Sequence, residues 1–187
     1  FLDEGKTERE CCAYVEAAAK AAGYEAFDFG CKLKAGDKIY YNNRGKNMYL
    51  IKVGTENIAK DGIRIIASHI DSPRLDLKQL PLYESEGVAL GKPHYYGGLR
   101  KYQWAAIPLA LHGVVALKDG TTVQVKVGED ESDPVFYISD LLPHLAAKQN
   151  QMPLGNAIEG EQLNIWFGNI PYTAATEDDE KTVKNNV

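Results

Sequence analysis

The sequence has 187 residues, of which 44% are hydrophobic and 25% charged, and its formal net charge is −5. These values are ordinary for a soluble globular protein and allow one domain or two small ones. Lysine and arginine are scattered along the chain, which argues against nucleic acid or an anionic membrane as a partner. No apolar run approaches the length of a membrane span.

The cysteines indicate the cellular compartment of the protein, and the two ends of the chain indicate whether the sequence is a fragment. The cysteines are Cys11, Cys12 and Cys31, and no Cys-x-x-Cys pair occurs. An odd number of cysteines without such spacing predicts reduced thiols, and hence a cytoplasmic protein. The chain begins with Phe1 and ends in a polar, charged run over 176–187, so we expect a fragment of a longer protein.

The first elements predict a helix packed against a mixed sheet. A capping-box pattern at 7–10 begins an amphipathic helix that ends near Gly23. A hairpin with turn residues at its centre is predicted over 38–53, and a nearly all-apolar strand follows at 62–68. Helix, hairpin and buried strand together indicate an α/β fold. The buried stripe expected on the helix consists of Cys11, Val15, Ala18 and Ala22.

From about residue 81 the pattern becomes almost entirely β. Pro108 interrupts a long apolar run, and Pro143 is tolerated because it falls early in a predicted helix. The predicted architecture is therefore a segment of an α/β domain over residues 1–80, followed by a β-rich domain over residues 81–187. The elements expected after the first strands lie at 75–78, within 103–117, at 121–127, at 140–149 (a helix capped by Ser139) and at 161–167.

The candidate site lies where the strand at 62–68 ends. His69 and Asp71 follow this strand, and Ser72 and Pro73 stop any regular continuation. In open α/β sheets, ligands bind at the carboxyl ends of strands. A histidine there can offer one ring nitrogen to a metal while an aspartate two residues later accepts the other ring N–H. For these two residues alone, a structural histidine held by a turn aspartate is the alternative.

The flanking sequence adds a family resemblance. Four segments carry it: 67–78, which contains His69-Ile70-Asp71, then 94–104, 128–131 and 138–146. In their order and spacing these segments resemble the M18 family of metallo-aminopeptidases, the relatives of aspartyl aminopeptidase. The resemblance extends from about residue 36 to residue 171. The family's remaining catalytic segments, which follow its dimerisation domain, find no match in this sequence.

The resemblance implies roles for three residues. His69 would bind one of the two zinc ions of each subunit. Asp71 would orient the His69 ring without binding the metal itself. His144, in the dimerisation domain, would reach the active site of the neighbouring subunit and donate to the developing oxyanion. A lone histidine on a helix is otherwise usually structural or on the surface, and that alternative stays open for His144.

The implied protein is a zinc-dependent aminopeptidase that hydrolyses the N-terminal residue of peptides with a metal-activated water. Residues 1–80 would begin its mixed-sheet zinc-peptidase domain, and residues 81–187 would form the inserted dimerisation domain. Because only one ligand is present, we expect the 187 residues alone to be inactive. Two alternatives remain: a non-catalytic oligomerisation or binding module, and an unrelated single-metal enzyme built on His69. The preference for acidic or apolar N-terminal residues is open.

Self-association is expected from the β-rich half. Trp104, Trp166 and Phe167 fall in or beside its strands, and a small domain cannot cover so much aromatic surface alone. The resemblance implies that two such domains pair and that the dimers assemble into a closed shell, usually a dodecamer.

Other polar residues give weaker signals. His94 and His112 have no partner at ligand spacing, so roles in packing or turns are favoured. Gly97 and Gly98 lack the spacing of a phosphate loop and predict a backbone bend. The acidic residues at 129–131 predict a solvated loop, with calcium binding as a remote alternative.

Overall fold

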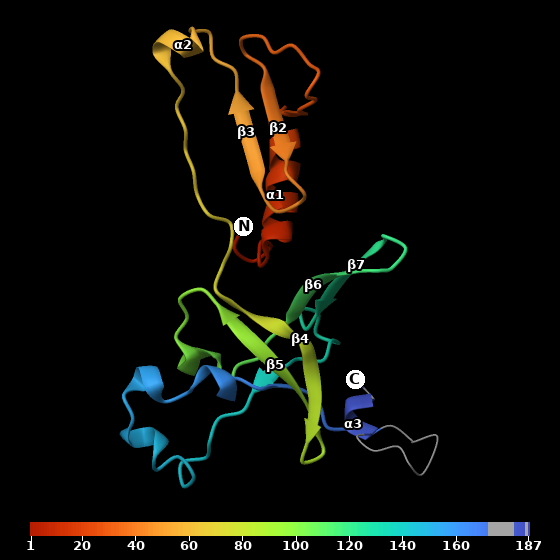
Figure 1. The fold of residues 1–187 in the computed structure, drawn as a ribbon, viewed down its shortest axis with the longest axis vertical. Helices are drawn as coiled ribbons and strands as arrows, with labels where there is room; N and C mark the ends of the chain where they lie inside the picture. The colour runs from red at the N-terminus through yellow and green to blue at the C-terminus, as the bar shows by residue number, and fades with distance from the viewer. Residues whose placement is uncertain (172–181, 186) are drawn as a thin grey trace. The chain divides into compact units, whose positions relative to one another are not determined.

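The computed structural model describes residues 1–171, 182–185 and 187. These residues form two compact units, Phe1–Ser72 and Pro73–Val187 (Figure 1). The division falls ahead of the predicted boundary between residues 80 and 81, because the strand that begins at Arg74 pairs within the second unit. Residues 176–181 and 186 of the polar C-terminal run lie outside the described residues. Within the part of the chain that is described, no helix combines the length and apolar character needed to cross a membrane.

The first unit contains the predicted helix and hairpin. Strands β1 and β2 run parallel, and β2 and β3 run antiparallel, in the order β1-β2-β3. The turn predicted inside the hairpin forms at Asn42, whose Oδ1 accepts a hydrogen bond from the Gly45 backbone N–H at 2.7 Å. The elements of this unit are α1 (Glu8–Ala21), β1 (Glu25–Ala26), β2 (Lys38–Asn42), β3 (Met48–Lys52) and α2 (Ile58–Asp61).

Helix α1 begins and ends as the sequence predicts. The Thr7 side chain accepts a hydrogen bond from the Glu10 backbone N–H at 3.3 Å, and Glu10 Oε2 accepts from the Thr7 backbone N–H at 2.9 Å. This capping box satisfies backbone donors that the start of a helix leaves unpaired. Gly23 has a φ of 78°, the left-handed conformation expected of the residue that follows a helix.

The buried face of α1 differs from the predicted stripe. Ala18 and Ala22 are exposed, whereas Cys12 and Ala19 are buried. The helix turns Glu16 toward the sheet because polar side chains of β2 donate hydrogen bonds to its carboxylate. Hydrogen bonds from Lys20 and from β2 hold the pKa of Glu16 below its ordinary value. The β2 donors are Tyr40 Oη at 3.3 Å and Asn42 Nδ2 at 2.7 Å.

Residues 62–73 form neither helix nor strand, in contrast to the strand predicted at 62–68. The side chains of Ile63, Ile65 and Ile66 are 63%, 74% and 101% exposed. A strand needs a neighbouring backbone to pair its N–H and C=O groups, and the described residues supply no neighbour for 62–68. The segment is apolar as the sequence predicts, but no described residue provides the partner on which a strand depends.

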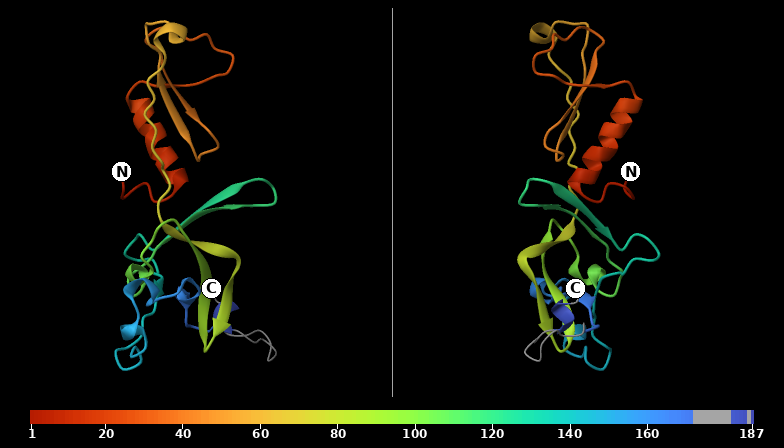
Figure 2. Two further views of the ribbon diagram at one scale, coloured as in Figure 1. Left: turned by 60° about the vertical axis from the view of Figure 1, so that its left-hand side comes forward. Right: turned by 90° about the vertical axis from the view of Figure 1, so that its right-hand side faces the viewer.

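The second unit is organised around a four-stranded antiparallel sheet in the order β4-β5-β9-β8. A separate hairpin, β6–β7, extends away from this sheet, as both views in Figure 2 show. The strand predicted at 75–78 is longer than expected because a bulge between Leu77 and Leu82 lets β4 continue. The strands are β4 (Arg74–Ser85), β5 (Val88–Tyr96), β6 (Leu111–Ala116), β7 (Thr122–Val127), β8 (Tyr137–Ile138) and β9 (Ile165–Gly168).

Short helical turns connect the strands, and the helix predicted at 140–149 is wrong. The backbone of 142–146 makes a single turn in which Ala146 N–H donates to Leu142 O at 3.0 Å. Pro143 has no N–H to extend such a turn. The Asp140 carboxylate accepts from the Leu141 N–H and from Gln149 Nε2, which a helix over this range would prevent. The short helices are η1 (Lys101–Trp104), η2 (Gln149–Gln151), η3 (Leu154–Asn156), η4 (Gly160–Gln162) and α3 (Thr182–Asn185).

Several aromatic side chains of the second unit pack in or against its hydrophobic core. Trp104 and Phe167 pack against the buried cluster, and the Trp166 ring stacks on Tyr137 at a centroid distance of 5.3 Å. Trp104, Trp166 and Phe167 are therefore partly covered within their own unit, while Tyr95, Tyr96 and Tyr137 stay 44%, 38% and 39% exposed. The buried cluster consists of Ala105, Phe136, Ile138, Ile158, Leu163 and Ile165.

The contact between β5 and β9 provides a test of this packing. A Cβ atom added at Gly91 would overlap the Phe167 ring, which the neighbouring Phe136 ring holds at a centroid distance of 4.9 Å. We predict that Gly91→Ala lowers the free energy of unfolding by about 1–3 kcal/mol, the usual effect of overpacking. Thermal or urea denaturation followed by tryptophan fluorescence measures the change.

The matched control is Gly113→Ala. Gly113 also lies within a strand, but a Cβ there meets nothing within 4 Å. Equal effects of the two substitutions would show that Phe167 does not pack on Gly91 in solution.

Candidate functional site

His69 and Asp71 form a local pair in the first unit. The His69 Nδ1 atom lies 2.9 Å from the Asp71 backbone oxygen and 3.3 Å from Asp71 Oδ1. Both acceptors belong to one residue, so the Nδ1–H tautomer is favoured and Nε2 is left with its lone pair. The His69 side chain is 84% exposed and that of Asp71 37% exposed. The ring therefore presents Nε2 away from the aspartate and open to a ligand.

This pair fits the chemistry of a zinc ligand. Metal-binding histidines usually donate their second ring N–H to a carboxylate or a backbone carbonyl, which fixes the tautomer and the ring orientation. Asp71 offers both kinds of acceptor to His69. A zinc site needs about four ligands, however, and nowhere in 1–171, 182–185 and 187 do three His, Cys, Asp or Glu side chains gather as a metal-binding group.

The residues next to His69 and Asp71 in the sequence make contacts inside their own units. On one side, the Cys11 thiol of α1 donates to the Ile70 backbone oxygen at 3.4 Å. Burial raises the pKa of the Cys11 thiol, so this donor keeps its proton. On the other side, Gly97 packs on Pro73, since a Cβ at Gly97 would lie 3.4 Å from Pro73 Cα. Gly97 has a φ of 79°, which agrees with the predicted backbone bend.

His144 lies in the second unit, in the turn that follows Pro143, and its side chain is exposed. The residue is therefore available for contact with another molecule but is not on the helix that the sequence predicted. Three exposed leucines surround it in sequence: Leu141 at 53%, Leu142 at 59% and Leu145 at 62%.

The other two histidines lie on strands. His94 is exposed on β5, opposite Asp76 of β4, and its ring stacks on Tyr95 at 6.0 Å. The neighbouring Asp76 accepts from Arg74 Nε at 2.8 Å. No metal-binding group forms here among the described residues.

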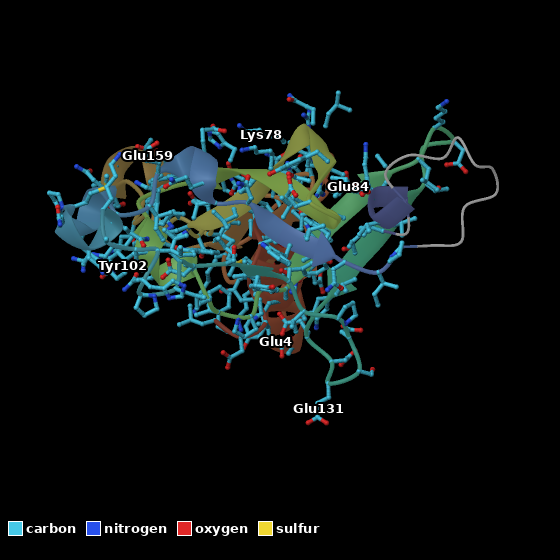
Figure 3. All side chains as sticks on the ribbon, turned by 90° about the horizontal axis from the view of Figure 1, so that it is seen from below. Glu4, Lys78, Glu84, Tyr102, Glu131 and Glu159 are labelled. Atoms are coloured by element: carbon cyan, nitrogen blue, oxygen red, sulfur yellow. The ribbon has the colours of Figure 1, made fainter. Side chains whose placement is uncertain are left out.

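His112 makes a contact that sequence reasoning missed. Its Nε2 lies 2.8 Å from Glu129 Oε1, and the two side chains are only 8% and 27% exposed. The acidic residues at 129–131 lie in an exposed loop, as the sequence predicts, and Glu129 makes this contact in addition. Strand register is the feature from which this contact could have been predicted. The β6–β7 pairing sets His112 opposite Lys126, and the bend at Gly128 brings Glu129 back toward β6. Glu131 projects from the tip of the loop (Figure 3).

Comparisons with known proteins place this chain in a family. The model of the Aminopeptidase I zinc metalloproteases (M18) matches residues 1–187. A probable M18 family aminopeptidase 1 from Clostridium acetobutylicum is 48% identical over 191 residues, with all of this chain and 40% of the relative aligned. The chain therefore matches a family of zinc metalloproteases in sequence. It belongs to the M18 aminopeptidase family.

Solved structures agree with this assignment. The crystal structure of an M18 aminopeptidase from Thermotoga maritima matches with a TM-score of 0.87 and 37% identity, over 99% of this chain and 40% of that chain. The Saccharomyces cerevisiae mApe1 dodecamer matches in fold, with a TM-score of 0.66 and 19% identity, over 92% of this chain and 37% of that chain. The chain thus spans about 40% of the length of the relatives it matches.

The His112–Glu129 contact yields a stability prediction. Glu129→Ala removes the carboxylate that accepts from His112 Nε2, and the low exposure of His112 limits replacement by water. We predict a loss of about 1–3 kcal/mol in the free energy of unfolding, measured by urea denaturation. Glu131→Ala is the control, because that exposed side chain should contribute less than about 0.5 kcal/mol. Indistinguishable midpoints for the two variants would contradict a stabilising His112–Glu129 contact.

Proposed function

We propose that the full-length protein is a zinc-dependent aminopeptidase that removes the N-terminal residue from peptides. The observation that carries this proposal is the His69–Asp71 geometry, in a segment whose resemblance to the M18 family implies a zinc ligand at His69. The relatives are named as aminopeptidases, and the family description names zinc. The chain spans 40% of those relatives, so the complete activity is assigned to the longer protein.

His69 would contribute Nε2 as one ligand to a site of two zinc ions, and Asp71 would hold the ring by accepting from Nδ1–H. The remaining ligands and the general base would come from residues beyond this chain. Zinc in such a site supplies an activated water that attacks the scissile carbonyl. Asp71 contributes by keeping His69 in one tautomer and one orientation, since its backbone oxygen lies 2.9 Å from Nδ1. The isolated 187 residues would lack peptidase activity.

The second unit would serve as the dimerisation domain, with the first unit as the opening segment of the catalytic domain. His144 would act across the dimer by donating to the developing oxyanion. Its exposure and the exposed Leu141, Leu142 and Leu145 around it support an interface at this turn. The dodecamer of the yeast relative supports, at the level of fold, assembly of dimers into a closed shell.

A non-catalytic oligomerisation or binding module is the rival function, and metal analysis discriminates between the two. Such a module would need neither zinc at His69 nor His144 near a reacting carbonyl. Cytoplasmic location is part of the proposal. Its support is that Cys11, Cys12 and Cys31 are all free thiols in the structure.

Metal content tests the ligand assignment. In the full-length protein, His69→Ala should lose one zinc per subunit, because the ligand itself is removed. Asp71→Asn should weaken zinc affinity about 10–100-fold, because the orienting carboxylate is lost. Elemental mass spectrometry and competition with a chelator measure both effects. His94→Ala is the matched control, since His94 is another exposed histidine and should keep full zinc. Full occupancy in the His69 variant would return that residue to a structural role.

Subunit mixing tests the role of His144. If each site combines His69 of one subunit with His144 of its neighbour, His69→Ala and His144→Ala subunits each lack activity alone. A mixed dimer holds one site with both histidines intact, so random exchange should restore up to about a quarter of wild-type activity. The control mixes two differently tagged His69→Ala preparations, which should recover nothing. Absence of recovery despite demonstrated subunit exchange would exclude action across the dimer.

A further inference from the structure

The thiol of Cys11 lies between two backbone oxygens of the first unit. Cys11 is on α1 and is only 2% exposed, and its Sγ lies 3.4 Å from the Gly5 oxygen and 3.4 Å from the Ile70 oxygen. Gly5 precedes α1 in the sequence, whereas Ile70 stands between His69 and Asp71. One buried side chain therefore links the first helix to the backbone of the candidate site.

The Ile70 oxygen is well placed to transmit a restraint to the His69 ring. It belongs to the peptide group that joins Ile70 to Asp71, and a peptide group moves as a rigid plane. Both acceptors that face His69 Nδ1 belong to Asp71, the backbone oxygen at 2.9 Å and Oδ1 at 3.3 Å. A donor that holds the Ile70 oxygen therefore limits rotation of the plane that leads into Asp71, and with it the placement of these acceptors.

We propose that Cys11 is a positioning residue for the zinc ligand His69, because its thiol restrains the Ile70–Asp71 peptide whose aspartate orients the ring. This inference rests on the proposed function, since it gives Cys11 a part in zinc binding at His69. A thiol is a weak donor, so loss of Cys11 should weaken zinc binding and not abolish it. The sulfur also fills its space closely, because a Cβ added at Gly5 would lie 2.8 Å from Cys11 Sγ.

The neighbouring Cys12 separates positioning from packing. Cys12 is on the same helix and is 1% exposed, so Cys12→Ala and Cys11→Ala each remove one buried sulfur from α1. Of these two cysteines, only Cys11 donates a hydrogen bond to the segment 69–71 within the described part of the chain. A role in packing alone predicts similar consequences for both substitutions, whereas a positioning role predicts an additional effect on zinc for Cys11→Ala.

Zinc affinity of the full-length protein, measured by competition with a chelator, tests the proposal. Cys11→Ala should weaken the affinity about 3–10-fold, the effect of losing one modest hydrogen bond. Cys12→Ala should leave the affinity unchanged, although both variants lower Tm because each loses a buried sulfur. Cys11→Ser keeps a donor near the two oxygens, so it should recover part of the affinity without recovering Tm. Equal zinc affinities for Cys11→Ala and Cys12→Ala would overturn the positioning role.

His69→Ala in the same assay distinguishes failure of this inference from failure of the proposed function. If His69→Ala retains full zinc, the proposed function is refuted and the role of Cys11 falls with it. If His69→Ala loses one zinc per subunit while the two cysteine variants bind zinc equally, only the role of Cys11 is refuted.

Hydrogen exchange provides a readout that does not depend on zinc. The Asp71 amide belongs to the restrained peptide, so in the full-length protein it should exchange about 3–10-fold faster in Cys11→Ala than in Cys12→Ala. The amides of β2 at Lys38–Asn42 serve as the internal reference, and they should respond alike to both substitutions. An Asp71 amide that exchanges at the same rate in both variants would show that the thiol does not hold this peptide, and would overturn the proposal.

Discussion

Backbone pairing between strands that follow one another in sequence is the interaction on which this structure depends. The hairpins β2–β3, β4–β5 and β6–β7 each join neighbours across a short turn, so their N–H and C=O groups are satisfied locally. β9 is the exception: it joins β5 from far along the chain and brings Phe167 onto Gly91 to close the core of the second unit. Residues 62–68 lie outside this scheme and remain irregular.

The same constraint explains how much of the fold could be predicted. The capping box at Thr7 and the turn after Asn42 involve residues a few positions apart, and both form as expected. Two predictions that depend on more than the local sequence pattern are wrong. The pattern at 140–149 predicts a helix capped by Ser139, but no helix forms there, and Pro143 has no N–H to extend one. The apolar pattern at 62–68 predicts a strand, but no neighbouring strand among the described residues pairs with it.

The contacts made by the candidate site residues and by the other histidines also differ in how well the sequence predicts them. His69 and Asp71 are two residues apart, so their hydrogen-bonded geometry could be expected from the sequence and is found in the structure. The contact between His112 and Glu129 spans 17 positions and depends on hairpin register, which hydropathy alone does not specify. The remaining donors of a metal site must likewise come from distant positions, because converging ligands are a product of tertiary structure and not of spacing along one segment.

The segment that carries His69 and Asp71 has few restraints of its own. Ile70 is tied to α1 through the Cys11 thiol, and Pro73 is packed on Gly97 at the start of the second unit. Between these two points the backbone forms no regular structure, and the His69 ring extends into solvent. These two contacts position the backbone of the segment. Among the described residues, the orientation of the His69 ring depends on Asp71. A ligand that must meet a second group of ligands within fractions of an ångström needs a stiffer support than this segment has in the structure.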